Sequence, residues 1–181
     1  VLDAKGWQDF CQTYASRFAK HIETFPNSQP DDKAFESEKK MFESFKWGMA
    51  YLCPRGIGST EWTGSEKAQT HRLRRFYLLG QTVDSMRIWD IRRSVQALKQ
   101  ISGMEKKPLW IQAHRDLAAD AVYASLFEEG ITRLDLHEMP NSHESGPAYL
   151  NILKHLDLPQ AVAMAAAHDV PVIPFGVGSS L

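Results

Sequence analysis

The sequence predicts an α/β fold: one domain over residues 1–181, with three layers (α/β/α) around a mostly parallel sheet. The first observation that predicts it is the alternation of helical segments with short apolar runs of strand length. The second is a length of 181 residues with 43% hydrophobic content, which fits one compact domain with a sizeable core. Because strands that alternate with helices pair in parallel through right-handed crossovers, we expect flanking helices around the sheet.

The N-terminal part of the chain predicts two helices. Residues 1–3 could end a strand, and a helix is expected over residues 4–23. Its apolar positions recur at helical spacing: Trp7, Phe10, Cys11, Tyr14, Phe18 and Ile22. Turn-forming residues at 26–32 interrupt the pattern, and Asp31 or Asp32 can cap a second helix.

The middle of the chain predicts a strand, a loop and a basic segment. The nearly continuous apolar run 47–53 is typical of a strand covered on both faces, as in a parallel sheet. A glycine-rich loop follows at 54–62. Segment 64–75 is polar and carries four cationic side chains: Lys67, Arg72, Arg74 and Arg75. They fit a solvated face, with a binding surface as the alternative.

The C-terminal half alternates helices and strands. Thr82 can cap a long helix that ends near Ile101, and Gly103 follows at a common stopping position. Strands are predicted at 109–112, 131–136 and 170–175, and helices at 117–129, 148–155 and 159–167.

The carboxyl ends of these strands predict a ligand site, because ligands gather at that edge of a parallel sheet. Four loops should converge there: 55–60, 113–116, 138–145 and 176–180. The candidate binding residues are Arg55, Ser59, His114, Arg115 and Asp116. Arg115, together with helix N–H groups, can hold an anion or carboxylate. Alternatively, it pairs with a nearby acid and only fills the pocket.

Three stretches carry a family resemblance: residues 51–60 with their Arg-Gly-x-Gly loop, residues 75–93, and residues 142–160. They resemble the α/β-hydrolase superfamily, and more narrowly bacterial acetyl xylan esterase-like proteins. The resemblance implies a fold equivalent to the central part of an α/β-hydrolase, lacking the family's first strands and its last strand. It also implies acetyl ester hydrolysis of the carbohydrate-esterase type.

The nucleophile position departs from the family pattern. A Gly-x-Ser-x-Gly elbow needs serine at its strained tip and small neighbours around it. The matching residues are 113–117, with Arg115 in the serine position and Leu117 in place of a glycine. Arginine keeps its proton near neutral pH, so it cannot act as an acyl-transfer nucleophile. We therefore expect a degenerate elbow without the standard Ser-acid-His triad.

Another candidate for catalysis is Ser142 with His143, oriented by Glu144. Side chains of sequence neighbours diverge, so Ser142 fits a turn or helix cap better. His137, Glu138 and His143 match no standard metal spacing. The sequence therefore predicts no metal and no cofactor.

Charge and composition restrict the partners. The net charge of −1 gives no electrostatic case for nucleic acid or an anionic membrane, and no apolar run approaches a bilayer span of about 20 residues. Cys11 and Cys53 form no disulfide framework. The chain is expected to be soluble; its compartment stays open, including secretion of a longer parent protein.

Three functions stay open at this stage. One is a carbohydrate-esterase-type protein without the triad. The second is a non-catalytic binding module for an anionic or sugar ligand at the carboxyl edge. The third is a structural domain of a larger enzyme. Unpaired sheet edges also predict a homodimer through a sheet edge or a helix face.

Overall fold

The computed structural model describes residues 1–18 and 29–176 of the protein. These residues form a mixed α/β structure whose parallel sheet has the order β1 (Leu109–His114), β2 (Ile131–His137) and β3 (Val172–Phe175). The expected α/β class with a parallel sheet is confirmed for these residues, while its equivalence to a hydrolase stays a prediction. None of the described helices is long and apolar enough to cross a bilayer.

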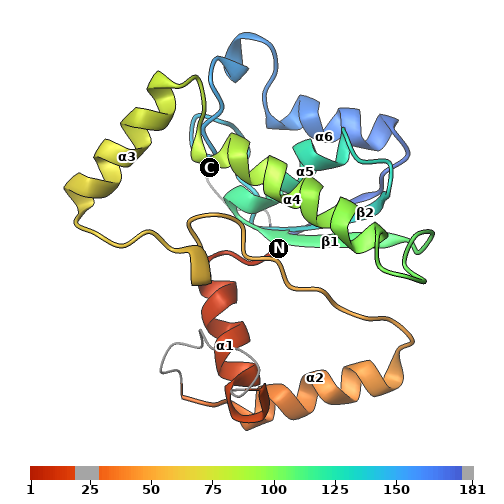
Figure 1. Cartoon of the computed structure of the whole chain (residues 1–181). Coiled ribbons are helices and arrows are strands. Elements are labelled where there is room, and N and C mark those ends of the chain that lie inside the picture. Colours follow the sequence, from red (N-terminus) through yellow and green to blue (C-terminus); the bar gives the residue numbers. More distant parts are fainter. Residues whose placement is uncertain (19–28, 177–181) are drawn as a thin grey trace.

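Three helices build the core on one face of the sheet (Figure 1). They are α4 (Val83–Lys99), α5 (Asp116–Ser125) and α6 (Leu158–Ala167). α5 packs directly on β1 and β2, and every residue from 117 to 125 is buried. Its alanines let the helix approach the strands closely. Side chains alternate along a strand, so the buried face of the sheet carries Ile111, Ala113, Leu134 and Leu136.

The opposite face of the sheet is only partly covered. In Figure 1, α1 (Ala4–Phe18) and α2 (Asp32–Ser44) lie on that side, below the sheet. These two helices pack through aromatic rings, as between Tyr14 of α1 and Phe35 of α2, whose centroids lie 6.1 Å apart. On this face Trp110 is 55% exposed and Phe175 is 41% exposed. The arrangement is compatible with three layers, in which the second helical layer is incomplete among the described residues.

The predicted strand at 47–53 is wrong, because the segment is irregular and residues 47–50 are exposed. A strand needs a partner that forms hydrogen bonds along its length. In the described backbone this segment forms only one such bond, from the Leu2 N–H to the Leu52 carbonyl at 2.8 Å. The Val1 amino group donates to the Gln112 carbonyl at 2.7 Å. Residues 1–2 thus lie between residue 52 and β1, but residues 1–3 form no strand, so the expected strand end is wrong.

Two further predictions need correction. The basic segment forms a helix, α3 (Glu66–Leu78), which Ser65 caps by accepting a hydrogen bond from the Ala68 N–H. The helix expected at 148–155 is only a 3-10 turn, η2 (Ile152–Lys154), because Asn151 adopts a left-handed backbone with φ 62°. The helix expected at 4–23 is present over Ala4–Phe18, and residues 19–23 lie outside the described residues.

Candidate functional site

Each of the three strands is followed by a residue with positive φ. Arg115, Glu138 and Gly176 directly follow β1, β2 and β3, with φ values of 52°, 51° and 56°. The Arg115 N–H donates to the His137 carbonyl at 2.8 Å, and the Glu138 N–H donates to the Phe175 carbonyl at 2.9 Å. Only glycine adopts positive φ freely, so Arg115 and Glu138 are strained. Strained residues concentrate at functional sites, which makes this carboxyl edge the candidate site.

A ladder of three stacked rings lies beside these turns. His114, His137 and Phe175 are the last residues of their strands and are in register with one another. The ring centroids of His114 and His137 are 4.4 Å apart, and those of His137 and Phe175 are 4.5 Å apart, with interplanar angles of 13° and 10°. Burial, and then the neighbouring His137, lowers the pKa of His114. The imidazole of His114 is therefore held neutral at neutral pH.

Arg115 is clamped between two carboxylates. Its guanidinium donates to Asp3 and pairs with Glu138, at 3.2 Å between Nε and Oε2. The other oxygen of Asp3 accepts from the Gly6 N–H at 2.7 Å, at the start of α1. Two acids neutralise the single cation and leave it little capacity for an external anion. This matches the expected alternative in which Arg115 pairs with acids and fills the pocket.

Arg55, another predicted binding residue, lies in a different environment. Its side chain pairs with Asp90 of α4, with 2.8 Å between Nε and Oδ2. Burial acts to raise the pKa of Asp90, but the hydrogen bonds from Arg55 outweigh it and hold this pKa below its usual value. The pair fastens the loop after residue 53 to α4. Ser59 lies exposed in the 3-10 turn η1 (Gly58–Thr60).

Asp116 belongs to an acidic group at the start of α4 and α5. Burial, and then the charge of Asp84, raises its pKa, while Arg87 opposes the shift. Asp84 also accepts from Arg87 at 3.0 Å and from the Ala148 N–H at 2.9 Å. Of the five predicted binding residues, His114 belongs to the ring ladder and Arg115 lies next to it, whereas Arg55, Ser59 and Asp116 lie in other surroundings.

The geometry of Ser142 and His143 does not suit a catalytic pair. Nδ1 of His143 lies 2.9 Å from the Pro147 carbonyl oxygen, which can only accept, so Nδ1 carries the proton. Nε2 then accepts from the Tyr123 hydroxyl at 2.8 Å. Both ring nitrogens are thereby used. The Ser142 hydroxyl accepts instead from the Glu144 N–H at 3.1 Å, as expected for a turn residue.

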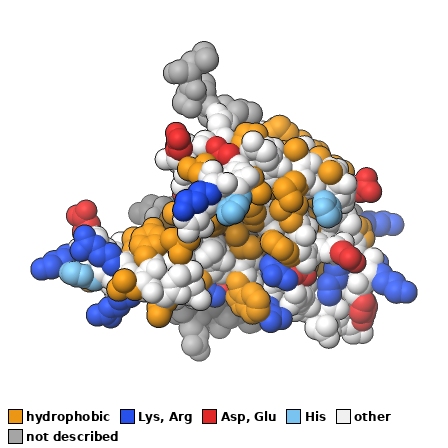
Figure 2. Space-filling view, turned by 90° about the horizontal axis from the view of Figure 1, so that it is seen from above, with side chains coloured by type: hydrophobic (Ala, Val, Ile, Leu, Met, Phe, Trp, Pro, Cys, Tyr) orange, Lys and Arg blue, Asp and Glu red, His pale blue; other side chains and the backbone are white. Residues whose placement is uncertain are grey.

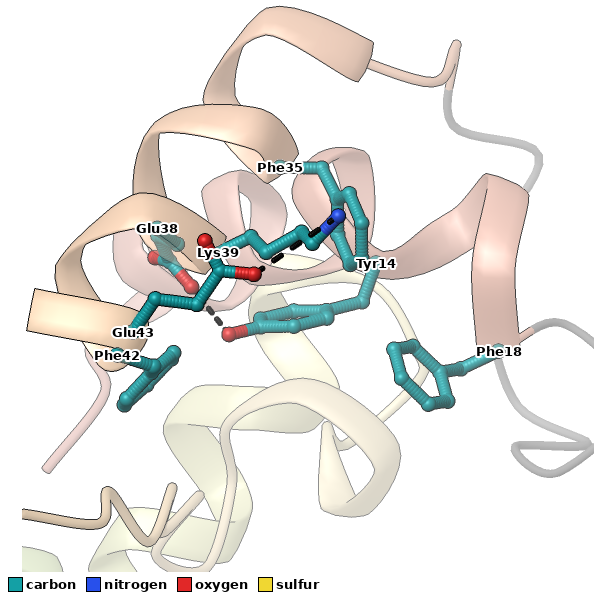
Figure 3. Close-up of a pocket in the computed structure, with 7 residues that line it drawn as sticks. All are labelled: Tyr14, Phe18, Phe35, Glu38, Lys39, Phe42 and Glu43. Atoms are coloured by element: carbon teal, nitrogen blue, oxygen red, sulfur yellow. Dashed lines mark hydrogen bonds and ion pairs between the residues drawn. The ribbon is translucent and has the colours of Figure 1, made fainter.

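A separate groove lies between α1 and α2 (Figure 3). Its volume is about 380 Å³, and its aromatic lining is formed by Tyr14, Phe18, Phe35 and Phe42. Glu38 accepts hydrogen bonds from the hydroxyls of Tyr14 and Tyr51. Burial, and then the bond to Glu38, raises the pKa of Tyr14. Because the carboxylate is tied to these tyrosines, the groove fits helix packing better than chemistry.

Sequence reasoning did not select Asp3 or Phe175 as site residues, and it weighed His137 and Glu138 only as metal ligands. His137 and Phe175 could have been found, because they end strands parallel to β1 and parallel register aligns such ends. Asp3 could not, because 112 positions of chain separate it from Arg115. Among residues 1–18 and 29–176, no three His, Cys, Asp or Glu side chains gather as a metal site would require.

No protein-family model, no curated protein and no solved structure matches this chain. The resemblance to α/β-hydrolases therefore stays a prediction, and a function must be argued from the site itself.

Proposed function

We propose that this chain is an α/β-hydrolase-like protein of the carbohydrate-esterase type whose carboxyl edge binds a sugar ligand without hydrolysing esters. The observation that carries the proposal is the conformation of Arg115. It lies on a sharp turn from β1 into α5 with φ 52° and ψ −128°. A strained strand-to-helix turn is the backbone of a nucleophile elbow, and here it presents a guanidinium.

The loss of ester hydrolysis follows from the side chains at this edge. Arg115 keeps its proton and cannot attack an acyl carbon. Its two carboxylate partners hold it in place, so it does not swing away to expose another nucleophile. His143, the nearest alternative base in the sequence analysis, already uses both ring nitrogens. Arg115 therefore supplies no nucleophile for acyl transfer, and His143 supplies no free base.

A neutral, hydroxyl-rich ligand suits the edge better than an anion. Asp3 and Glu138 together carry two negative charges, and Arg115 carries one positive charge. The negative net charge of this cluster repels an anion. Glu138 is 57% exposed and can accept hydrogen bonds from sugar hydroxyls. The imidazoles of His114 and His137 add groups that donate or accept.

Ester hydrolysis is tested with p-nitrophenyl acetate. We expect no release of p-nitrophenolate above the rate in buffer, because the elbow carries no nucleophile. The matched variants are Ser142→Ala and His143→Gln, which remove the alternative pair. Turnover by the unmodified chain that either variant abolishes would refute the loss of catalysis.

Sugar binding is tested by titration calorimetry with xylo-oligosaccharides, with and without acetyl groups. Glu138→Gln should weaken binding about tenfold, because it removes a hydrogen bond to a charged acceptor. Glu144→Gln is the matched control, since Glu144 is an exposed acid on the same loop. Binding of citrate or sulfate in preference to sugars, or equal losses in both variants, would contradict the proposal.

A further inference from the structure

Helix α3 projects from the body of the protein (yellow in Figure 1). None of its residues is buried, and it makes no extensive contact with another described helix or strand. An isolated helix of 13 residues is marginally stable in water, because most helical stability in proteins comes from packing. α3 is therefore the described helix with the most to gain from a partner.

One side of α3 is strongly basic. His71, Arg72 and Arg75 line a hollow of about 490 Å³ with Ala68, at spacings that place all four on one face. The helix carries four Lys or Arg residues and one Glu, a net charge of +3 in a chain of net charge −1. No ion pair ties these cations to an acid within residues 1–18 and 29–176.

Arg72 is held in position by Trp62 and Thr63. Its guanidinium lies over the ring of Trp62, at 5.2 Å from the centroid. Nη2 donates to the Thr63 carbonyl at 3.3 Å, whereas Nη1 is enclosed and has no acceptor among the described atoms. A fixed guanidinium loses little side-chain entropy when an acid binds beside it.

The same side of α3 ends in exposed leucines. Leu78 is 86% exposed and Leu79 is 73% exposed, and they follow Arg75 by three and four positions. That spacing continues the basic face along the helix. Figure 2 shows basic side chains gathered on this projecting end, with hydrophobic side chains beside them. The surface therefore combines cations with an apolar end.

We infer that this basic face of α3 (Ala68, His71, Arg72, Arg75, Leu78 and Leu79) docks an acidic protein segment that also carries apolar side chains. A nucleic acid backbone would satisfy the cations but leave the leucines unused. Leu78 and Leu79 lie among the cations, whereas a helix on a bilayer keeps its apolar side chains on a separate face. The exposed Leu73 and Tyr77 lie on the other side of α3, so binding to vesicles is compared in the test. The inference does not depend on sugar binding at the carboxyl edge.

The test uses the whole chain and a fluorescein-labelled peptide in which Glu pairs and Leu recur at helical spacing. Fluorescence anisotropy should show binding that weakens as salt rises. Arg75→Glu should weaken it at least about tenfold, because one attraction becomes a repulsion. Lys154→Glu makes the same charge change on exposed η2 and should alter it less than about twofold. Leu78→Ser should weaken binding while leaving its salt dependence unchanged.

Several outcomes would overturn the inference. One is no binding up to about 1 mM peptide. Others are equal binding of a peptide with every Glu replaced by Gln, or equal losses in Arg75→Glu and Lys154→Glu. Tighter binding of phosphatidylserine vesicles or duplex DNA than of the peptide would assign the surface to those partners instead. Self-association that Arg75→Glu abolishes would assign it to a second copy. Circular dichroism checks that each variant folds.

Discussion

Asp120 shows how a single residue in the core responds to its surroundings. The side chain is fully buried in α5. One carboxylate oxygen accepts from the Tyr149 hydroxyl, and the other has no partner among the described atoms. Burial raises the pKa of Asp120 well above its usual value; the Tyr149 bond and Arg87 oppose the shift, and Asp84 and Asp116 add to it.

This environment predicts a pH-dependent stability. The folded pKa of Asp120 lies above the unfolded value, so its contribution is fully present below about pH 4 and is lost as pH rises through the folded pKa. Asp120→Asn removes the ionisable group. We expect its free energy of unfolding to exceed that of the unmodified chain by about 1–3 kcal/mol at pH 8.

The check on Asp120 is urea unfolding at pH 4 and pH 8. The advantage of Asp120→Asn should shrink at pH 4, because there the folded state keeps the proton and the unfolded state is about half protonated. Asp9→Asn, on the exposed side of α1, is the control and should show little change at either pH. An advantage that is equal at both pH values would show that ionisation of Asp120 is not responsible.

Among the helices, α3 and α4 both begin with a capping residue, but only α4 is packed on the core. Thr82 and Ser85 form a reciprocal capping box at the start of α4, whose buried side faces the core. Ser65 caps α3, which has no buried residue. A cap affects global stability only when its helix is coupled to the core, so the two should behave differently.

Thr82→Ala should therefore lower the global free energy of unfolding by about 1 kcal/mol. Ser65→Ala should leave global stability unchanged and only increase fraying of α3. Urea unfolding followed by circular dichroism measures the first effect, and amide exchange in α3 measures the second. Equal losses of global stability would mean that α3 is coupled to the core after all.

Over the whole molecule, buried residues are unevenly distributed. α5, β1 and β2 form the densest part of the core, whereas α3 stands apart. Amides in the core open only through global unfolding, and amides in an unpacked helix open locally.

We therefore expect the amides of α5 and β2 to exchange more than about 100-fold more slowly than those of α3. Hydrogen exchange measured by mass spectrometry tests this difference directly. Comparable protection in both regions would indicate that α3 is packed in solution. Adding the acidic peptide should slow exchange in α3 and leave α5 unchanged.

The unpaired edge of β3 leads to a further prediction, which concerns the oligomeric state of the whole molecule. No described strand pairs with the outer side of β3, and an unpaired strand edge favours association. The homodimer expected from the sequence stays a prediction; light scattering should give twice the 20.5 kDa of one chain. Ile173→Lys on β3 should shift it to the monomer, whereas Thr132→Lys on the interior strand β2 should not. A monomer at high concentration would exclude the dimer.

The sequence by itself determined the elements whose signals are local. Thr82 predicted the start of α4, because a cap acts on the next turn of its own helix. Alternating helices and strands predicted the parallel pairing of β1 with β2, because a helical crossover reverses the chain. That Arg115 cannot act as an acyl-transfer nucleophile was equally visible, since a guanidinium keeps its proton near neutral pH.

Only the tertiary structure decided which of these residues act together. The run 47–53 has a strand composition but is irregular, because a strand exists only where another backbone pairs with it. Asp3 meets Arg115 across 112 positions, and His137 stacks between His114 and Phe175. Such contacts depend on the packing of distant segments, which local periodicity does not encode.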